Sequence, residues 1–376
     1  MSILIGGDFV PTESNVSLFN KCDLDELFGD PLQNIMKTVD LRVFNLETPL
    51  ADELHPILKC GPNLCAPVNA VNTFCAIGVD LFTLANNHIM DQGIEGLEST
   101  EKALKDNNIE YVGVGCNIYE ASEPYFVTIN GKKYCFFACT DHEFSVCDEH
   151  KAGANPFDPI VSFDQVQRAC EACDYLIVLY HGGKEHYRYP SPRLQKICRK
   201  FVDSGANLVI CQHSHCIGCE EKYNRSTIVY GQGNFLFDHS DSEFWKTGLL
   251  IRINEDDHID YIPIIKRTNG VRLADDSIGE RIMNDFRERS KEILLPGVIQ
   301  KKYKDFADEM LDWYLNVLLK EETTLFRIIN KLTMNKMRIR RNKKMRNTEF
   351  LVKLLNFTEC EAHNELFVQG IKGAIK

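Results

Sequence analysis

Five apolar, strand-like runs of this sequence each end at side chains that can bind a metal ion. They are MSILIGG before Asp8, DLRVFNL before Glu47, GVDLFTLAN before Asn87 and His88, DYLIVLY before His181, and GANLVICQ before His213 and His215. Open α/β folds place their sites at the carboxyl ends of the strands. The five ends therefore predict an Asp, Glu, Asn and His cluster at one edge of a sheet, with a metal-dependent enzyme as the leading hypothesis.

Up to about residue 268, apolar runs alternate with stretches of helical periodicity, which predicts a layered α/β sandwich with some antiparallel strands. The runs PYFVTIN and KYCFFACT predict a hairpin, because Asn130-Gly131 between them is a two-residue turn signal. STIVYGQGNFLFD and KTGLLIRINEDDHIDYIPIIKR predict a second antiparallel pair. The expected helices cover residues 22–38, 67–77, 93–107, 163–173 and 191–204.

After about residue 270 the pattern becomes helical, from 276 to 362, with apolar residues three and four apart. We therefore predict two domains, residues 1–268 with the candidate site and residues 269–376 as a helical region. Residues 331–346 carry eight basic side chains and no acidic one. This segment could bind an anionic polymer, a membrane surface or nucleic acid, but a solvated helix face is the favoured interpretation.

Composition narrows the class of protein. The net charge of −11 over 376 residues argues against nucleic acid as the partner of the whole chain. The N-terminus lacks the basic start of a signal peptide, and no stretch is apolar enough to span a membrane, so a cytoplasmic location is expected. The CxxC pairs Cys170/Cys173 and Cys216/Cys219 could form a zinc site, but reduced, packed thiols are favoured.

The segment Asn86-Asn87-His88 with Asp91 is the sharpest local signal. An Asn carbonyl oxygen can bind a metal, and His88 can serve as a general acid near neutral pH. Asp91, three residues on, could orient that imidazole. The alternative is a helix N-cap, with Asp91 capping a helix that begins near Gly93.

The later blocks add imidazoles and further polar groups. His181 follows an almost wholly apolar run and precedes two glycines, which suits a ligand beside a closely approaching substrate. Glu185 could contact substrate or be solvated. His213 and His215 should lie on the same side of an extended segment, because side chains alternate along a strand. Asn234, after two glycines, could bind substrate or cap a turn.

The first two blocks supply carboxylates. Asp8 follows Gly6-Gly7, and Glu47 stands at a strand tip before Thr48-Pro49. Either carboxylate can ligate a divalent cation, and Glu47 could bridge two. Taken alone, each could also belong to an ordinary turn.

Together the blocks resemble the CapA family of poly-γ-glutamate capsule biosynthesis proteins, whose fold is similar to calcineurin-like metallophosphatases. GGD, NLE, LANNHxxDxG, HGGKE, QHSH and GNFLFD come in the family's order across roughly residues 1–268. The resemblance implies a four-layer α/β/β/α sandwich with a C-terminal helical extension. It also implies the metal ligands Asp8, Glu47, Asn87, His181, His213 and His215.

The resemblance further implies His88 as the catalytic acid. Read from the residues themselves, Asp91 is expected to assist His88, and Asn86, Glu185 and Asn234 are expected to contact the substrate. The metallophosphatase pattern has a His two residues after the first Asp, where this chain has Val10. One or two divalent ions are therefore expected, and the mixed nitrogen and oxygen donors suit manganese, iron or zinc.

The implied activity is metal-assisted hydrolysis. The expected substrate is an anionic polymer or a phosphoester, and the bond that is cleaved would be a phosphoester or a γ-glutamyl bond of an envelope polymer. The alternative is a non-catalytic metal-binding accessory or assembly factor for capsule or polyglutamate biosynthesis. A ligase or transferase that acts on amide bonds is a third possibility, but the sequence has no GxxxxGK[ST] loop to support use of ATP. Composition does not indicate an oligomeric state.

Overall fold

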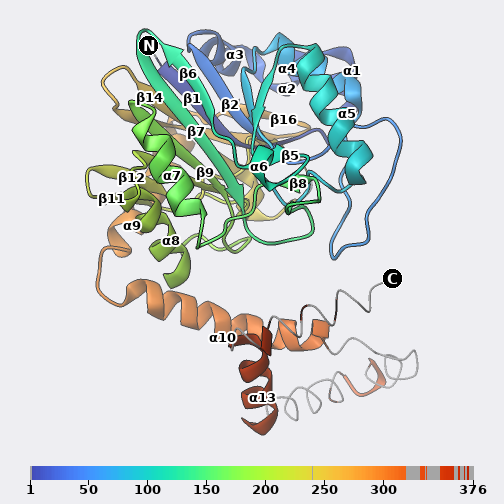
Figure 1. Cartoon of the computed structure of the whole chain (residues 1–376), viewed down its shortest axis with the longest axis vertical. Helices are drawn as coiled ribbons and strands as arrows, with labels where there is room; N and C mark the ends of the chain where they lie inside the picture. The colour runs from blue at the N-terminus through green and yellow to red at the C-terminus, as the bar shows by residue number, and fades with distance from the viewer. Residues whose placement is uncertain are drawn as a thin grey trace. The chain divides into compact units, whose positions relative to one another are not determined.

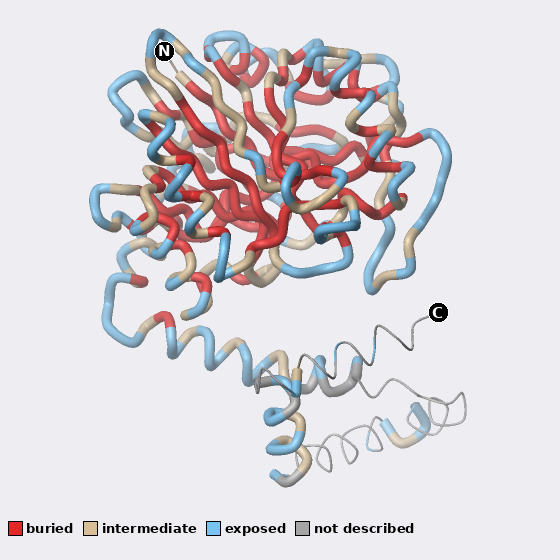
Figure 2. Tube along the Cα trace, viewed as in Figure 1, coloured by how far each residue is buried: buried red, intermediate tan, exposed pale blue. Residues whose placement is uncertain are grey.

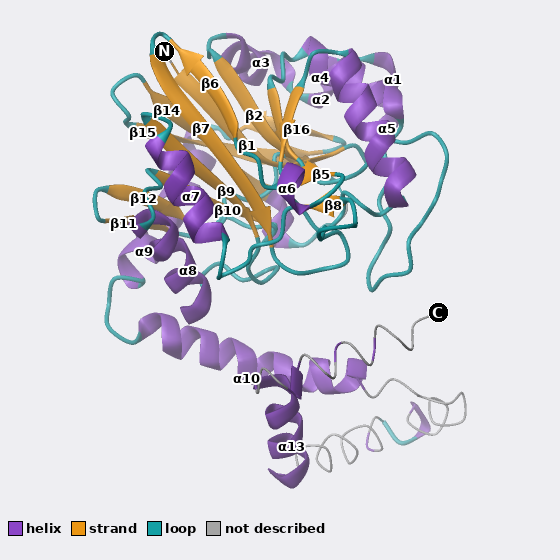
Figure 3. Cartoon of the chain, in the orientation of Figure 1, coloured by secondary structure: helices purple, strands orange, loops and turns teal. Residues whose placement is uncertain are grey.

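The computed structural model describes residues 2–238, 240–318, 331–334, 336, 348–359, 363–364, 368 and 371. The chain divides into two compact units, residues 1–300 and 301–376. Every described strand belongs to the first unit (Figures 1 and 3).

The larger sheet of the first unit has eight strands. Its order is β16 (Gly270–Leu273), β15 (Ile259–Arg267), β14 (Thr247–Asn254), β1 (Ser2–Val10), β2 (Leu41–Leu46), β3 (Leu81–Thr83) and β4 (Glu110–Val112), while β13 (Leu236–Phe237) also pairs with β1. Strands β1 to β4 are parallel. Strands β14, β15 and β16 extend the sheet in antiparallel fashion.

The second sheet has six strands and a parallel centre. Its order is β11 (Glu220–Tyr223), β12 (Ser226–Val229), β10 (Leu208–Gln212), β9 (Tyr175–His181), β7 (Lys132–Thr140) and β6 (Tyr125–Ile129). The predicted hairpin at Asn130-Gly131 is confirmed, since β6 and β7 pair antiparallel up to Ile129↔Lys132. A small antiparallel pair is formed by β5 (Val114–Gly115) and β8 (Gly153–Ala154).

Alternating side chains of the strands build three apolar layers. In β9, Ile177 and Leu179 face a core that the strands of the two sheets build together with Ala85, whereas Val178 faces a second core that includes α8. In β1, Ile3 and Ile5 face the core between the sheets, and Leu4 faces the helices beyond the first sheet. Because these strands are buried on both faces, they appear in the sequence as continuous apolar runs (Figure 2).

Helices cover the outer faces of both sheets. The first sheet is covered by α1 (Val16–Lys21), α2 (Leu24–Leu27), α3 (Gly29–Lys37), η1 (Val68–Ala70), α4 (Val71–Ala76) and α5 (Gly93–Asp106). The second sheet is covered by α7 (Ser162–Glu171) and α8 (Pro192–Asp203), and short α6 (Ile118–Ala121) lies against β5. The predicted four-layer α/β/β/α sandwich with a helical C-terminal extension is confirmed.

Two local predictions are wrong. The helix expected over 22–38 is broken at Phe28, which lies between α2 and α3, and Gly29 at the start of α3 takes a φ of 70°. The second antiparallel pair also fails, because β12 lies in one sheet and β14 in the other. The real hairpin is β14–β15, inside the second of those two runs.

The region after residue 268 begins with elements of the first unit. Helix α9 (Asp276–Glu292) packs Ile282 and Phe286 against Leu249 and Ile265 of the larger sheet. The boundary at residues 268/269 therefore marks the end of β15, whereas the compact unit continues to Gln300. The two-domain division of the sequence stays a prediction.

Helix α10 (Val298–Leu318) spans the division between the units, and α13 (Thr348–Glu359) lies in the second. Most of the basic segment 331–346 lies outside the described residues, which include only 331–334 and 336 of it. Among the helices that the structure describes, none has the length and apolar character needed to cross a membrane.

Candidate metal centre

The two sheets bring their polar strand ends together. Parallel pairing of β1 with β2 sets Asp8 opposite Asn45, two residues before Glu47. In the other sheet, pairing of β9 with β10 sets His181 opposite Gln212, directly before His213. The predicted cluster therefore forms from the edges of two facing sheets rather than from one sheet.

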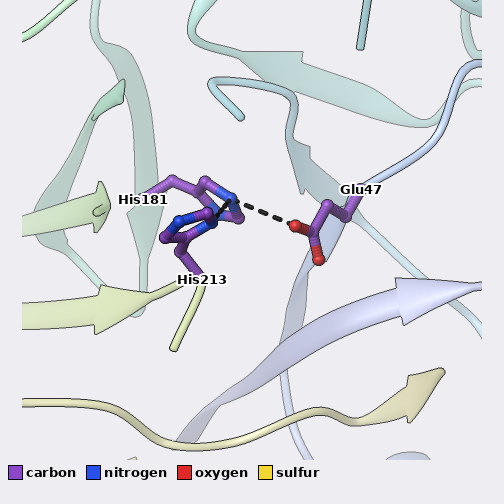
Figure 4. A group of neighbouring side chains, drawn as sticks. All are labelled: Glu47, His181 and His213. Carbon is purple, nitrogen blue, oxygen red and sulfur yellow. Dashed lines mark hydrogen bonds and ion pairs between the residues drawn. The ribbon is translucent and has the colours of Figure 1, made fainter. Parts of the chain in front are cut away.

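Glu47, His181 and His213 form the first group of side chains that could hold a cation (Figure 4). The Nε2 atom of His181 lies 3.2 Å from Glu47 Oε1 and 3.2 Å from His213 Nδ1. Asn87 Oδ1 lies 2.9 Å from the same Nε2. Three further potential donor atoms thus lie within 3.2 Å of His181 Nε2.

Asp8, Glu47 and His215 form the second group, so Glu47 belongs to both. Within each group the potential ligand atoms lie within 4.8 Å of one another. His215 Nδ1 lies 3.4 Å from Asp8 Oδ2 and 2.9 Å from Asn234 Oδ1. The arrangement has the form of two neighbouring cation sites with a shared carboxylate.

The Glu47 carboxylate fits a metal ligand. The residue is fully buried, and among the described residues neither of its oxygens has a hydrogen-bond partner. A buried carboxylate without hydrogen bonds is costly unless it is neutralised or coordinates a cation. The donor set around it suits a divalent metal.

Burial and mutual charge shift the pKa of these groups in opposite directions. Burial and the charge of Asp8 raise the pKa of Glu47 well above its usual value. Burial would raise the pKa of Asp8, but the hydrogen bond from His215 and the nearby imidazoles lower it to about 2. Burial lowers the pKa of His181 and of His213 to about 4.

His215 behaves differently from the other two imidazoles. Burial would lower its pKa, but Glu47 and Asp8 outweigh burial and raise the pKa to about 9. Without a cation, His215 therefore stays protonated near neutral pH, because it lies beside the carboxylates of Asp8 and Glu47.

The backbone at His213 and His215 is not the extended segment that the sequence predicts. Strand β10 ends at Gln212, and the two residues have φ values of 78° and 54°. The left-handed region is uncommon for residues other than glycine, and such strained positions cluster at functional sites. Both imidazoles reach the cluster through this turn, with ring centroids 6.1 Å apart.

His88 is held by Asp91, and Asp91 is held by a lysine. Asp91 Oδ2 lies 2.5 Å from His88 Nδ1, and Lys59 Nζ lies 2.5 Å from Asp91 Oδ1. Lys59 Nζ also lies 3.3 Å from His88 Nδ1. Burial lowers the pKa of His88, although Asp91 opposes the shift.

Asp91 does not cap the following helix. Gln92 is the N-cap of α5 and makes no side-chain cap bond. Asp91 instead accepts hydrogen bonds from Lys59 and from the backbone N–H of Leu64, 2.6 Å away. Its contacts therefore favour the orienting role over the N-cap.

The expected substrate contacts stay predictions. Asn86 is fully buried and donates to Asn45 Oδ1 and to the Leu46 carbonyl, so its contacts favour a positioning role. Glu185 is half-buried, and the charges of His213 and His215 lower its pKa against the effect of burial. Asn234 approaches His215, as described above.

Three residues at the site were missed in the sequence. Asn45 donates to Asp8 Oδ1 at 2.8 Å, and its Nδ2 lies 3.2 Å from His181 Nδ1. Glu143 Oε2 accepts from Asn87 Nδ2 at 3.4 Å. Lys59 belongs to the loop between β2 and η1. The sequence gives a sign of Asn45, because it is a polar residue inside an apolar run. It gives no such sign of Glu143 or Lys59.

The cysteine pairs stay outside this site. Cys216 and Cys219 are buried, whereas Cys170 and Cys173 are half-buried at the end of α7, and all are free thiols. Among the described residues, neither candidate metal group includes a cysteine.

Comparison with known proteins identifies the family. Residues 2–239 match the sequence profile described as bacterial capsule synthesis protein PGA_cap. The capsule biosynthesis protein CapA of Bacillus anthracis is 26% identical over 276 residues, which cover 70% of this chain and 67% of that protein. The PGA biosynthesis protein CapA of Bacillus subtilis is 29% identical over 157 residues, 41% of either chain.

Among solved structures, a novel phosphatase from Mycoplasma pneumoniae aligns with a TM-score of 0.42 and 14% identity, over 70% of this chain and 93% of that one. The profile match covers well over half of the chain, so the resemblance stated from the motifs is confirmed. The chain belongs to the bacterial capsule synthesis protein (PGA_cap) family.

Proposed function

We propose that this chain is a metal-dependent hydrolase that acts on a phosphoester or a γ-glutamyl bond in capsule or polyglutamate metabolism. The observation that carries the proposal is Glu47, a fully buried carboxylate whose oxygens accept no hydrogen bond from the described residues. It is shared between two groups of potential ligands. Two cations about a bridging carboxylate are a common device for hydrolysis.

The ligands under this proposal are Asp8, Glu47, Asn87, His181, His213 and His215. Divalent cations held there, such as manganese, iron or zinc, would supply electrophilic activation of the scissile group and an acidified water. Asn45 orients one of the ligands, since its side-chain NH2 donates a hydrogen bond to Asp8 Oδ1. Partners of this kind fix ligand orientation.

His88 is the proposed acid for the leaving group. Asp91 fixes the Nδ1 side of the ring, which leaves Nε2 to transfer a proton. Burial lowers the pKa of His88, so its protonated form is a stronger acid than an exposed imidazolium. His88 would give its proton to the leaving oxygen or nitrogen as the bond breaks.

A second candidate function is a non-catalytic accessory or assembly factor for the same polymer. The observation that favours it is Val10, where the metallophosphatase pattern has a histidine. Val10 is buried in an apolar cluster with Phe237 and Trp245, so its position contributes no ligand.

Metal analysis and a substrate screen test the proposal. Protein purified without chelator should contain a transition metal and, with added Mn2+, should hydrolyse a phosphodiester, a phosphomonoester or a γ-glutamyl anilide. Glu47→Gln should lose both the metal and the activity. Glu53→Gln is the control, because that side chain is 90% exposed.

The outcomes separate the two candidates. Bound metal with hydrolysis that depends on Glu47 supports the hydrolase, and the substrate that reacts decides its class. Bound metal without any hydrolysis favours the accessory factor. Absence of bound metal, with equal behaviour of the wild type and Glu47→Gln, refutes the metal-dependent proposal.

A further inference from the structure

Among the residues that the structure describes, the Asp8, Glu47 and His215 group has three ligand side chains, and Val10 does not supply the nitrogen donor that a histidine at that position would provide. Asn234 lies close to this group. We infer that the Asn234 carbonyl oxygen is the fourth ligand of the cation held there, and that it makes this site oxygen-rich. The inference rests on the proposed metal-dependent function.

The backbone fixes Asn234 beside Asp8. The next residue, Phe235, donates its N–H to the Asp8 carbonyl at 3.0 Å, and β13 then pairs in parallel with β1. The approach is so close that a Cβ on Gly7 would lie 2.0 Å from the Gly233 carbonyl oxygen. Gly233 itself has a φ of 72°. These glycines allow the segment to pass against the strand that carries Asp8.

The side chain of Asn234 points into the cluster. Asn234 is 6% exposed, and its Oδ1 lies 2.9 Å from His215 Nδ1. Asp8 Oδ2 lies 3.4 Å from the same nitrogen. Two oxygens thus converge on one ring nitrogen, which has room for one proton at most. A cation among the three atoms satisfies all of them together.

The first group shows the same pattern with Asn87. Its Oδ1 lies 2.9 Å from His181 Nε2, as Asn234 Oδ1 lies 2.9 Å from His215 Nδ1. Each half of the cluster therefore pairs one amide oxygen with an imidazole and shares Glu47. Asn234 is the counterpart of Asn87, and it supplies the fourth ligand to the Asp8 half, where Val10 cannot bind a cation.

The donor sets of the two halves differ in chemistry. With Asn234, the Asp8 half offers three oxygens and one nitrogen. The His181 half offers two nitrogens with the oxygens of Glu47 and Asn87. Oxygen donors suit Mn2+ and Mg2+, whereas imidazoles suit Zn2+ and iron. The Asp8 half should therefore prefer Mn2+ or Mg2+, and the His181 half should prefer Zn2+ or iron.

Titration of the metal-free full-length protein with Mn2+ and with Zn2+, followed by calorimetry, tests the assignment. The wild type should bind two Mn2+ ions. Asn234→Leu should weaken one Mn2+ site by about tenfold or more and leave the tightest Zn2+ site unchanged. Asn87→Leu should instead weaken the tight Zn2+ site, and Asn234→Asp, which keeps an oxygen, should retain both Mn2+ ions.

Asn72→Leu, at an exposed position of α4, is the matched control. Two unchanged Mn2+ sites in folded Asn234→Leu would overturn the assignment of Asn234 but leave the proposed function intact. A wild type that binds neither metal would overturn both.

A direct measurement covers the case in which the Leu variant does not fold. Crystals of the wild type soaked in Mn2+ should give an anomalous peak in contact with Asn234 Oδ1, Asp8 and His215. A peak that contacts Asp8 and His215 but stands away from Asn234 would refute the inference.

Discussion

Lys59 is a charged side chain held almost entirely out of solvent. Its side chain is 2% exposed, and its Nζ contacts Asp91, His88 and the carbonyl oxygen of Asn87. The loop that carries it is largely exposed on either side. A buried ammonium is stable only when it is paired, and here the pair also fixes the carboxylate that holds His88.

Lys59→Met should destabilise the fold, because it leaves the fully buried Asp91 carboxylate without its cationic partner. Loss of one partner of a buried pair costs roughly 3–5 kcal/mol, and we expect a free energy of unfolding lower by an amount of that order. Urea unfolding measures it. Lys102→Met, with a side chain 75% exposed on α5, should change it by less than about 0.5 kcal/mol. Equal urea midpoints for the two variants would contradict this account.

Binding of Mn2+ should release protons. At about pH 7 the metal-free site still holds the His215 proton, because the charges of Glu47 and Asp8 outweigh burial and raise the pKa of His215 to about 9. A ligand must be deprotonated to bind, so the affinity should increase with pH up to about pH 9, roughly tenfold per pH unit for each proton released.

Calorimetry in buffers of different ionisation enthalpy counts those protons. On binding Mn2+ at about pH 7, the wild type should release at least about one proton per protein molecule, and His215→Ala should release fewer. His258→Ala, with a side chain 68% exposed, is the control. An affinity that is independent of pH between 7 and 9 would contradict the assigned proton on His215.

The residues of the site differ in how well the sequence predicts them. Asp8, Glu47, His181 and His213 stand at the ends of apolar runs, where strand geometry forces their side chains toward a sheet edge. Lys59 gives no such signal, because its place depends on how an irregular loop folds over Asp91. Only the tertiary structure brings it within 2.5 Å of that carboxylate.

At the scale of elements, α8 supports the strands that carry two of the imidazoles. Its Phe201 and Cys198 pack in the same apolar core as Val178 of β9 and Val209 of β10. The helix begins with a side-chain cap, in which Ser191 Oγ accepts from the Leu194 N–H at 3.0 Å, and Pro192 follows. Ser–Pro at this point is a favourable start for a helix.

Ser191→Ala should lower the free energy of unfolding by about 1 kcal/mol, since the first turn of α8 loses its cap. Ser191→Asp, which can accept the same hydrogen bond, should restore most of the loss. Thermal or urea unfolding reports both. Ser204→Ala is the matched control, because the backbone N–H of Ser204 makes the cap at the other end of α8. A loss as large at Ser204 as at Ser191 would show that the cap is not the cause.

The sequence predicts helices well where apolar residues recur with helical periodicity, and it predicts poorly the backbone of turns. The helices expected over 93–107, 163–173 and 191–204 correspond closely to α5, α7 and α8. The turn after β10 was predicted as extended, because alternation gives no sign of a positive φ at a histidine. Tertiary contacts accompany the turn, since the His186 N–H donates to the Ser214 carbonyl and the His215 ring centroid lies 4.2 Å from that of Trp245.

At the scale of the whole molecule, the candidate site exists only because two sheets face one another. The sequence predicts strands and their apolar faces, but not which strands share a sheet. Hence β12 and β14 were expected to pair, although they belong to different sheets. Strand membership depends on long-range pairing, and neighbours along the chain give little information about it.

The division of the chain leads to a further prediction. The potential metal ligands all lie before residue 300, and Ile299 is buried in the core under α8. A fragment of residues 1–300 should therefore fold cooperatively and bind as many Mn2+ ions as the full chain. A fragment of residues 1–268 ends where the sequence predicts a boundary, but it lacks β16 and α9.

The shorter fragment should be much less stable than the longer one. Loss of α9 uncovers Leu249 and Ile265 and removes Ile282 and Phe286, and each buried side chain of this size contributes about 1.5–3 kcal/mol. Urea unfolding and Mn2+ titration of both fragments measure the difference. Equal stability of the two would place the boundary at residue 268 after all. Failure of the 1–300 fragment to bind Mn2+, when the full chain binds it, would show that the second unit is needed for the site.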